Sequence, residues 1–124
     1  MKSHKFILIS DCTKFAGLTP GIYNSHIGGK VVLDSKGRLS LAEQPELLAG
    51  SAQSLLWCVN KLVQTGLLSL EQAWNKASLN PIELLTGEVR APFQVGDSAN
   101  LVLFKQDQTG IRILKTMLAG DILF

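Results

Sequence analysis

The sequence predicts a mixed α/β fold, and three observations lead to that prediction. An apolar run of strand length lies within Lys5–Ser10, and its continuity is typical of a strand covered on both faces. From Ser51 onward, apolar residues recur at spacings of three and four, which indicates helix. After Gly87, short apolar runs separated by turn residues indicate strands again.

The composition limits the size of the domain and the classes of partner that the protein is expected to bind. The 124 residues suit one domain of ordinary size. Hydrophobic residues make up 46% and charged residues 18%, which is apolar for a small domain. The formal charge of +2 is small and evenly spread, so we expect neither nucleic acid nor a membrane as partner.

The cysteines and the N-terminal residues favour a cytoplasmic protein. Cys12 and Cys58 have neither the CxxC spacing of a metal or redox site nor a disulfide framework. Asp11 interrupts the first apolar run before it reaches the length of a signal-peptide core. No apolar stretch approaches the roughly 20 residues of a membrane-spanning helix.

A hairpin is expected after the first strand. Gly21–Tyr23 and Gly28–Leu33 have the composition of short strands. Asp34–Gly37 is a turn signal, and Arg38–Leu41 returns as the second arm of the hairpin. Gln44–Glu46, with its central proline, breaks the pattern.

Three helices are expected next. The first ends near Gly66, and its apolar face is formed by Leu55, Leu56, Val59, Leu62 and Val63. Ser69 and Gln72 form a capping box that begins a helix reaching about Ala77. Asn80–Pro81 supplies a cap and a first-turn proline for a third helix, which ends at Gly87.

The last part of the chain is expected to be β structure. Leu101–Phe104, Ile111–Leu114 and Asp121–Phe124 are the expected strands, with a turn at Asp107–Gly110. The first strand, by contrast, has no parallel neighbour nearby in the sequence. Its neighbours are therefore expected in another chain, or in a longer polypeptide of which this chain is a part.

Several motifs, in order, resemble the C-terminal portion of the N-acetylglucosamine-6-phosphate deacetylases, members of the metal-dependent amidohydrolase superfamily. Each motif alone is weak, but their shared order is more specific. The matching stretches are Leu8–Asp11, Ala16–Leu18 with Gly21–Tyr23, Leu48–Ser51, Ala77–Pro81, Val95–Val102 and Thr116–Leu123.

The resemblance implies the last part of a (β/α)8 barrel together with strands of a small β-sandwich. Residues 1–87 would be the C-terminal part of the TIM-barrel-like domain, and residues 88–124 would be sandwich strands. Lys5–Ser10 would be the last barrel strand, with Asp11 at the end that carries barrel active sites. Residues 22–42 would be a hairpin insertion, and residues 53–85 helices outside the barrel.

The resemblance also implies a chemistry, the hydrolysis of an N-acetyl amino-sugar phosphate in amino-sugar metabolism. Asp11 matches the catalytic aspartate, a proton shuttle for water activated by a divalent metal such as zinc. Ala52, Gln53 and Ser54 follow Leu48–Ser51, which matches a loop near the substrate, and they are the expected substrate-binding residues.

The implied site is incomplete in this sequence. In the family, a His-x-His pair, a glutamate and further histidines bind the metal on upstream strands, and this chain contains none of these motifs. We therefore expect the isolated chain to bind no metal by itself and to be inactive.

Two positions depart from the family pattern. Cys12–Thr13 replaces a small or apolar pair after the aspartate, which bears on substrate preference. Asn100 stands where aspartate is frequent in the sandwich motif, and this change should be mild.

Most other conspicuous residues have simpler interpretations than a role in chemistry. Without the resemblance, Asp11 itself could merely cap the loop after a strand. Surface or hydrogen-bonding roles are expected for the two histidines, packing for the cysteines and tryptophans, and a hairpin bend for the paired glycines: His4, His26, Cys12, Cys58, Trp57, Trp74, Gly28 and Gly29.

Two other functions remain open. The chain could be a non-catalytic interaction module or degenerate subunit, whose exposed apolar barrel surface is buried by homo-oligomerisation. It could also belong to another amidohydrolase, because the sandwich motif is shared across that superfamily.

Overall fold

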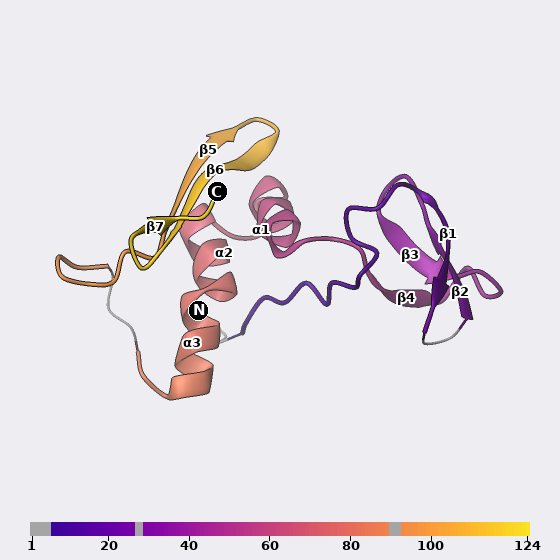
Figure 1. The fold of residues 1–124 in the computed structure, drawn as a ribbon, viewed down its shortest axis with the longest axis horizontal. Coiled ribbons are helices and arrows are strands. Elements are labelled where there is room, and N and C mark those ends of the chain that lie inside the picture. The colour runs from indigo at the N-terminus through magenta and orange to yellow at the C-terminus, as the bar shows by residue number, and fades with distance from the viewer. Residues whose placement is uncertain (1–5, 27–28, 90–92) are drawn as a thin grey trace.

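The computed structural model describes residues 6–26, 29–89 and 93–124. Two antiparallel sheets and three helices form two packed parts, which are joined by extended segments (Figure 1). Each part has its own apolar cluster. The mixed α/β class predicted from the sequence is confirmed.

The first part is a four-stranded antiparallel sheet in the order β1-β2-β3-β4. Its strands are β1 Gly21–Ser25, β2 Gly29–Leu33, β3 Arg38–Leu41 and β4 Leu48–Ser51. The core beneath it consists of Phe15, Val31, Leu33 and Leu39. The turn predicted between β2 and β3 is confirmed, and the Asp34 carboxylate closes it by accepting from the backbone N–H groups of Lys36 and Arg38, each at 2.8 Å.

Strand β4 is a departure from the sequence prediction, which expected a loop at Leu48–Ser51. The segment pairs with β3, Ser40 opposite Leu48 and Arg38 opposite Ser51, with a register shift between the two pairs. The break predicted at Gln44–Glu46 is the connection that turns the chain back. A four-residue segment containing glycine has a weak strand signal of its own, so pairing with β3 decides its conformation.

The three helices are α1 Leu55–Gln64, α2 Leu70–Ala77 and α3 Leu79–Thr86. The predicted capping box is confirmed: Ser69 Oγ accepts from the Gln72 N–H at 3.2 Å, and Gln72 Oε1 accepts from the Ser69 N–H at 3.0 Å. The predicted end of the third helix at Gly87 is also confirmed, with this glycine in the left-handed conformation.

The predicted start of the third helix is wrong. Helix α3 already begins at Leu79, so Asn80 and Pro81 lie inside its first turn. The Asn80 side chain does not cap the helix but donates to the Phe6 carbonyl at 3.0 Å. A contact with a residue 74 positions away has therefore displaced the local capping role.

The C-terminal sheet has the order β5-β6-β7, with β5 Leu101–Asp107, β6 Gly110–Leu118 and β7 Asp121–Ile122. It packs on α1 and α2 through the buried residues Val59, Ala73 and Ile111. These contacts cross the boundary expected at residue 88, and the division into domains 1–87 and 88–124 stays a prediction.

Within the expected barrel strand Lys5–Ser10, residues 6–10 do not form a strand, and Lys5 lies outside the described residues. Residues 6–10 are extended and belong to neither sheet. The Leu8 N–H donates to the Lys76 carbonyl at 2.8 Å, so the segment is fastened to α2 rather than to a strand. A β-strand requires a neighbouring strand for its hydrogen bonds, and no described segment lies beside residues 6–10 in that way. The barrel itself is not part of this structure.

Candidate functional site

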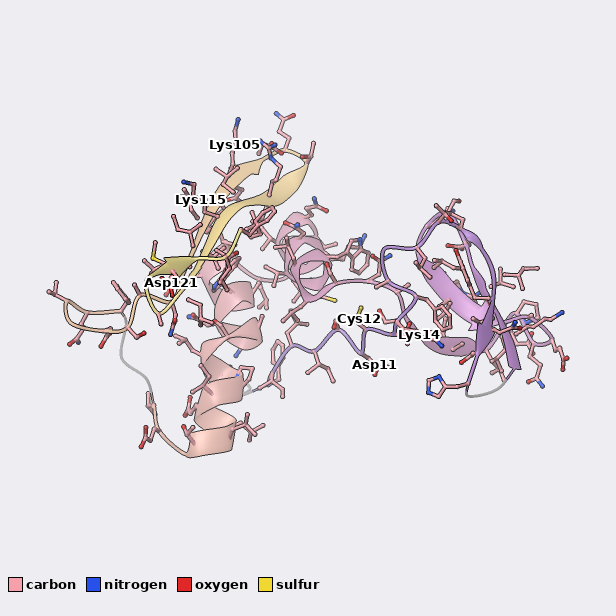
Figure 2. All side chains as sticks on the ribbon, in the orientation of Figure 1. Asp11, Cys12, Lys14, Lys105, Lys115 and Asp121 are labelled. Carbon is pink, nitrogen blue, oxygen red and sulfur yellow. The ribbon has the colours of Figure 1, made fainter. Side chains whose placement is uncertain are left out.

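Asp11 follows the extended segment and has an unusual backbone conformation. Its φ is +48°, in the left-handed region that residues other than glycine rarely adopt, although Asp and Asn tolerate it best. The residue is exposed, and its carboxylate points away from the ribbon, between the two packed parts (Figure 2). The Asp11 carboxylate is therefore open to solvent.

The backbone from Asp11 to Thr13 is bound to Ser51, the last residue of β4. The Ser51 N–H donates to the Asp11 carbonyl at 3.3 Å, and the Thr13 N–H donates to the Ser51 carbonyl at 2.8 Å. These bonds form a parallel bridge between Cys12 and Ser51. The structure therefore brings together Asp11 and the Leu48–Ser51 stretch, which the family resemblance had placed near the substrate.

The three expected substrate residues have structural contacts in this chain. Ala52 packs against the first core. Gln53 Nε2 donates to the Lys36 carbonyl at 3.1 Å, which ties the β2–β3 turn to the start of α1. Ser54 caps α1, its Oγ accepting from the Trp57 N–H at 3.2 Å. Their contact with a substrate stays a prediction.

A small hollow lies beside the loop that follows Asp11. Its volume is about 170 Å³, and it is lined by Gly17, Leu18, Pro20, Leu33, Asp34, Ser35, Gly37 and Ala52. Pockets for small ligands usually have a volume of about 300–1,000 Å³, so this hollow is small for a ligand site.

Asp34, at the edge of this hollow, has a structural role. The Arg38 N–H, more than any other group, lowers the pKa of the Asp34 carboxyl below its usual value, so this carboxylate closes the turn in its charged form. The sequence had assigned Asp34 only to this turn.

The described residues do not gather a set of metal ligands by themselves. Within residues 6–26, 29–89 and 93–124, no three His, Cys, Asp or Glu side chains gather closely enough to hold one. His26 is exposed after β1, while His4 lies outside the described residues.

The two cysteines are free, and their surroundings differ. Cys12 is exposed beside Asp11, so the packing role predicted from the sequence is wrong. Cys58 is half-buried on α1, and burial, followed by the charge of Cys12, raises the pKa of its thiol. The packing role predicted for Cys58 is met only in part, because the residue is half-buried and lies outside the buried core cluster.

Other residues singled out in the sequence have mainly structural surroundings. Trp74 stacks on Phe104 with ring centroids 5.4 Å apart, which confirms a packing role. Trp57 is 45% exposed and packs less than expected. Asn100 Oδ1 accepts from the Ala119 N–H at 2.8 Å, in line with the structural role expected there. Gly28 lies outside the described residues, and Gly29 begins β2.

Comparison with known proteins identifies the fold. No family model matches the sequence, and no curated protein matches it. The structure matches the crystal structure of N-acetylglucosamine-6-phosphate deacetylase from Pasteurella multocida with a TM-score of 0.72 and 20% sequence identity. The match covers 94% of this chain and 29% of that enzyme, so the chain spans less than a third of the protein it resembles.

This likeness confirms the resemblance first indicated by the sequence motifs, at the level of fold. The described residues have the architecture of one portion of a deacetylase. No helix in the described part of the chain is long and apolar enough to cross a bilayer.

Proposed function

We propose that this chain is the C-terminal portion of a deacetylase-like amidohydrolase and that Asp11 is its proton-transferring carboxylate. The observation that carries the proposal is the placement of Asp11, exposed and bound through its backbone to β4, within a fold shared with the Pasteurella multocida enzyme. From that enzyme's name, we propose an N-acetyl amino-sugar phosphate as the substrate class. The two free cysteines support a reducing, cytoplasmic setting.

Asp11 would perform two proton transfers in this reaction. Its carboxylate would take a proton from the attacking water while the water oxygen bonds to the carbonyl carbon. The resulting carboxylic acid would then return that proton to the nitrogen as the C–N bond breaks, which gives acetate and the free amine. The second transfer restores the carboxylate, so Asp11 is ready for another turnover.

Activity of the isolated chain is the first test. We expect the purified 124-residue protein to release no acetate from N-acetylglucosamine-6-phosphate above the buffer rate, with or without added Zn²⁺, because its described residues do not gather ligands for a metal. Acetate release that a chelator abolishes would show that the chain carries a complete site, contrary to the proposal.

A chimera tests the role of Asp11 directly. In it, this chain replaces the matched 29% of the Pasteurella multocida enzyme, and acetate release is measured once folding has been verified by circular dichroism. Asp11→Asn should lower kcat by about a hundredfold or more, because general acid–base catalysis is lost while the left-handed backbone is still tolerated.

Asp121→Asn is the matched control, because Asp121 is also exposed but lies on β7, remote from Asp11 (Figure 2). It should leave activity unchanged. Full activity of Asp11→Asn in a folded chimera would contradict the catalytic role. Hydrolysis of other N-acyl compounds in preference to the sugar phosphate would place the chain with another amidohydrolase.

A second candidate function is non-catalytic self-association. It is favoured by exposed apolar side chains on residues 6–9 and on α3, beside a groove of about 390 Å³ lined by Phe6, Ile7, Asn80, Glu83 and Leu84. Ile9 is 69% exposed and Leu85 is 85% exposed. Surfaces of this kind often mark interfaces.

Sedimentation velocity at increasing protein concentration tests this candidate. A dimer that is weakened by the double variant Ile9→Ser and Leu85→Ser would support it. A monomer at all concentrations would rule it out and leave the deacetylase proposal unaffected.

A further inference from the structure

We propose that Thr13 is a positioning residue, which together with Gly50 and Ser51 holds Asp11 in its left-handed conformation and thereby sets the direction of the Asp11 carboxylate. This inference rests on the catalytic role proposed for Asp11 and deepens it. The family resemblance connected the Cys12–Thr13 pair only with substrate preference. The contacts of Thr13 instead indicate a role in positioning Asp11.

A backbone bridge connects Asp11 and Thr13 to β4. The Ser51 N–H binds the carbonyl of Asp11, and the Ser51 carbonyl binds the N–H of Thr13, at 3.3 and 2.8 Å. One residue of β4 therefore holds the chain both at Asp11 and two residues beyond it. Because β4 is itself paired with β3, this anchor belongs to a packed sheet.

The side chain of Thr13 reinforces this bridge. Its Oγ1 donates to the same Ser51 carbonyl at 2.9 Å, so this oxygen accepts from both the backbone and the side chain of Thr13. The methyl group lies over Gly50, where an added Cβ would be 2.6 Å from Thr13 Cγ2. Gly50 has φ +101° and carries no side chain, so it leaves room for this methyl group. The half-buried Thr13 is thus held at both branches of its side chain.

The left-handed conformation of Asp11 requires such an anchor. A left-handed conformation costs about 1–2 kcal/mol for a residue with a Cβ, and it persists only where the surroundings impose it. If the anchor is released, Asp11 is expected to return to the extended region. Side chains leave an extended chain on alternate sides. A return of Asp11 to the extended region would therefore redirect its carboxylate.

NMR on the full 124-residue chain tests the proposal without requiring catalysis. A strong intraresidue NOE between the amide proton and Hα of Asp11 reports a positive φ. Thr13→Val removes the hydroxyl and keeps both the branch and the methyl group, whereas Thr13→Ser keeps the hydroxyl. We expect Thr13→Val to lose the strong NOE at Asp11 and Thr13→Ser to retain it.

The outcomes separate positioning from mere stabilisation. A folded Thr13→Val chain that keeps the NOE at Asp11 would overturn the proposal, even if its stability were lower. If Thr13→Val fails to fold, Thr13→Ala, which also lacks the hydroxyl, decides: loss of the NOE supports the proposal, and its retention overturns it.

Activity of the chimera described above separates this proposal from the proposed function. Thr13→Val should lower kcat by about ten- to a hundredfold with KM unchanged, because misplacement of a catalytic group slows the chemical step. Thr13→Ser should restore most of the activity. Full activity of the Asp11→Asn chimera would overturn the catalytic role of Asp11. The NMR experiment would still test, independently of catalysis, whether Thr13 holds the backbone of Asp11.

Discussion

Asn60 and Ile111, which are 51 residues apart, bind each other through two reciprocal hydrogen bonds. The Ile111 N–H donates to Asn60 Oδ1 at 2.7 Å, and Asn60 Nδ2 donates to the Ile111 carbonyl at 3.3 Å. Asn60 lies on α1 and Ile111 on β6. One amide side chain therefore satisfies both backbone groups of a buried strand residue and holds the C-terminal sheet against the helix.

Replacing Asn60 should loosen this sheet. Asn60→Ala leaves the N–H and the carbonyl of Ile111 without these partners, and should lower the free energy of unfolding by about 1–3 kcal/mol. Urea denaturation measures the change. Gln64→Ala is the control, because the side chain of Gln64 makes an exposed bond to the Thr109 carbonyl, and the loss of this bond should cost less than about 1 kcal/mol. Equal costs for the two variants would argue against the role given to Asn60.

Gly50 should tolerate no side chain. Gly50→Ala places a Cβ 2.6 Å from Thr13 Cγ2 at a φ of +101°, and should destabilise the chain by about 1–3 kcal/mol. Gly17→Ala, at φ +79° with no atom within 4 Å of its Cβ, should show only the backbone strain, about 1 kcal/mol.

A double-mutant cycle separates the contact with Thr13 from that strain. Thr13→Ser removes the methyl group, so Gly50→Ala in this background should cost about as much as Gly17→Ala. An unchanged cost would mean that the methyl group of Thr13 is not what excludes a side chain at Gly50.

Gln53 should contribute to stability as well as to any substrate contact. Gln53→Ala removes the bond to the Lys36 carbonyl and should lower the free energy of unfolding by about 1 kcal/mol. Thermal unfolding of the isolated chain measures this effect in the absence of substrate. A variant with unchanged stability but a raised KM in the chimera would instead assign Gln53 to the substrate alone.

The charge state of Asp107 should depend on Thr109. The Thr109 hydroxyl, followed by its backbone N–H, lowers the pKa of Asp107 below 3.8. A lowered carboxylate pKa means that the unfolded chain binds the proton more readily, so the contribution of Asp107 to stability is present above 3.8 and is lost as the pH falls through the folded value.

Substitution of Thr109 tests this dependence. Thr109→Val should raise the pKa of Asp107 toward 3.8, and Thr109→Ser should leave it near its present value. An NMR titration of the Asp107 carboxyl carbon measures both. A pKa that does not respond to Thr109→Val would show that the hydroxyl is not the dominant cause.

Features governed by neighbouring residues could be predicted from the sequence. The capping box at Ser69, the turn at Asp34 and the left-handed end of α3 at Gly87 each depend on residues within a few positions, and each is confirmed. The start of α3 was missed because the Asn80 side chain binds a carbonyl far away in the sequence.

The candidate site also combines local features, which the sequence predicts, with long-range contacts, which it does not. The motif order pointed to Asp11 and to Leu48–Ser51, but not to the contact between them. Only the tertiary structure places the Ser51 backbone against Asp11 and Thr13. No local pattern encodes a pairing across 38 residues, because its hydrogen bonds exist only after β4 has joined the sheet.

The sequence by itself determined the helices, the turns and the apolar character of residues 6–9, because each follows from local spacing and composition. The tertiary structure decided three other features: strand β4, the left-handed Asp11 and the absence of a strand at residues 6–10. A strand needs a partner strand and a strained backbone needs an anchor, and neither condition can be established from neighbouring residues alone.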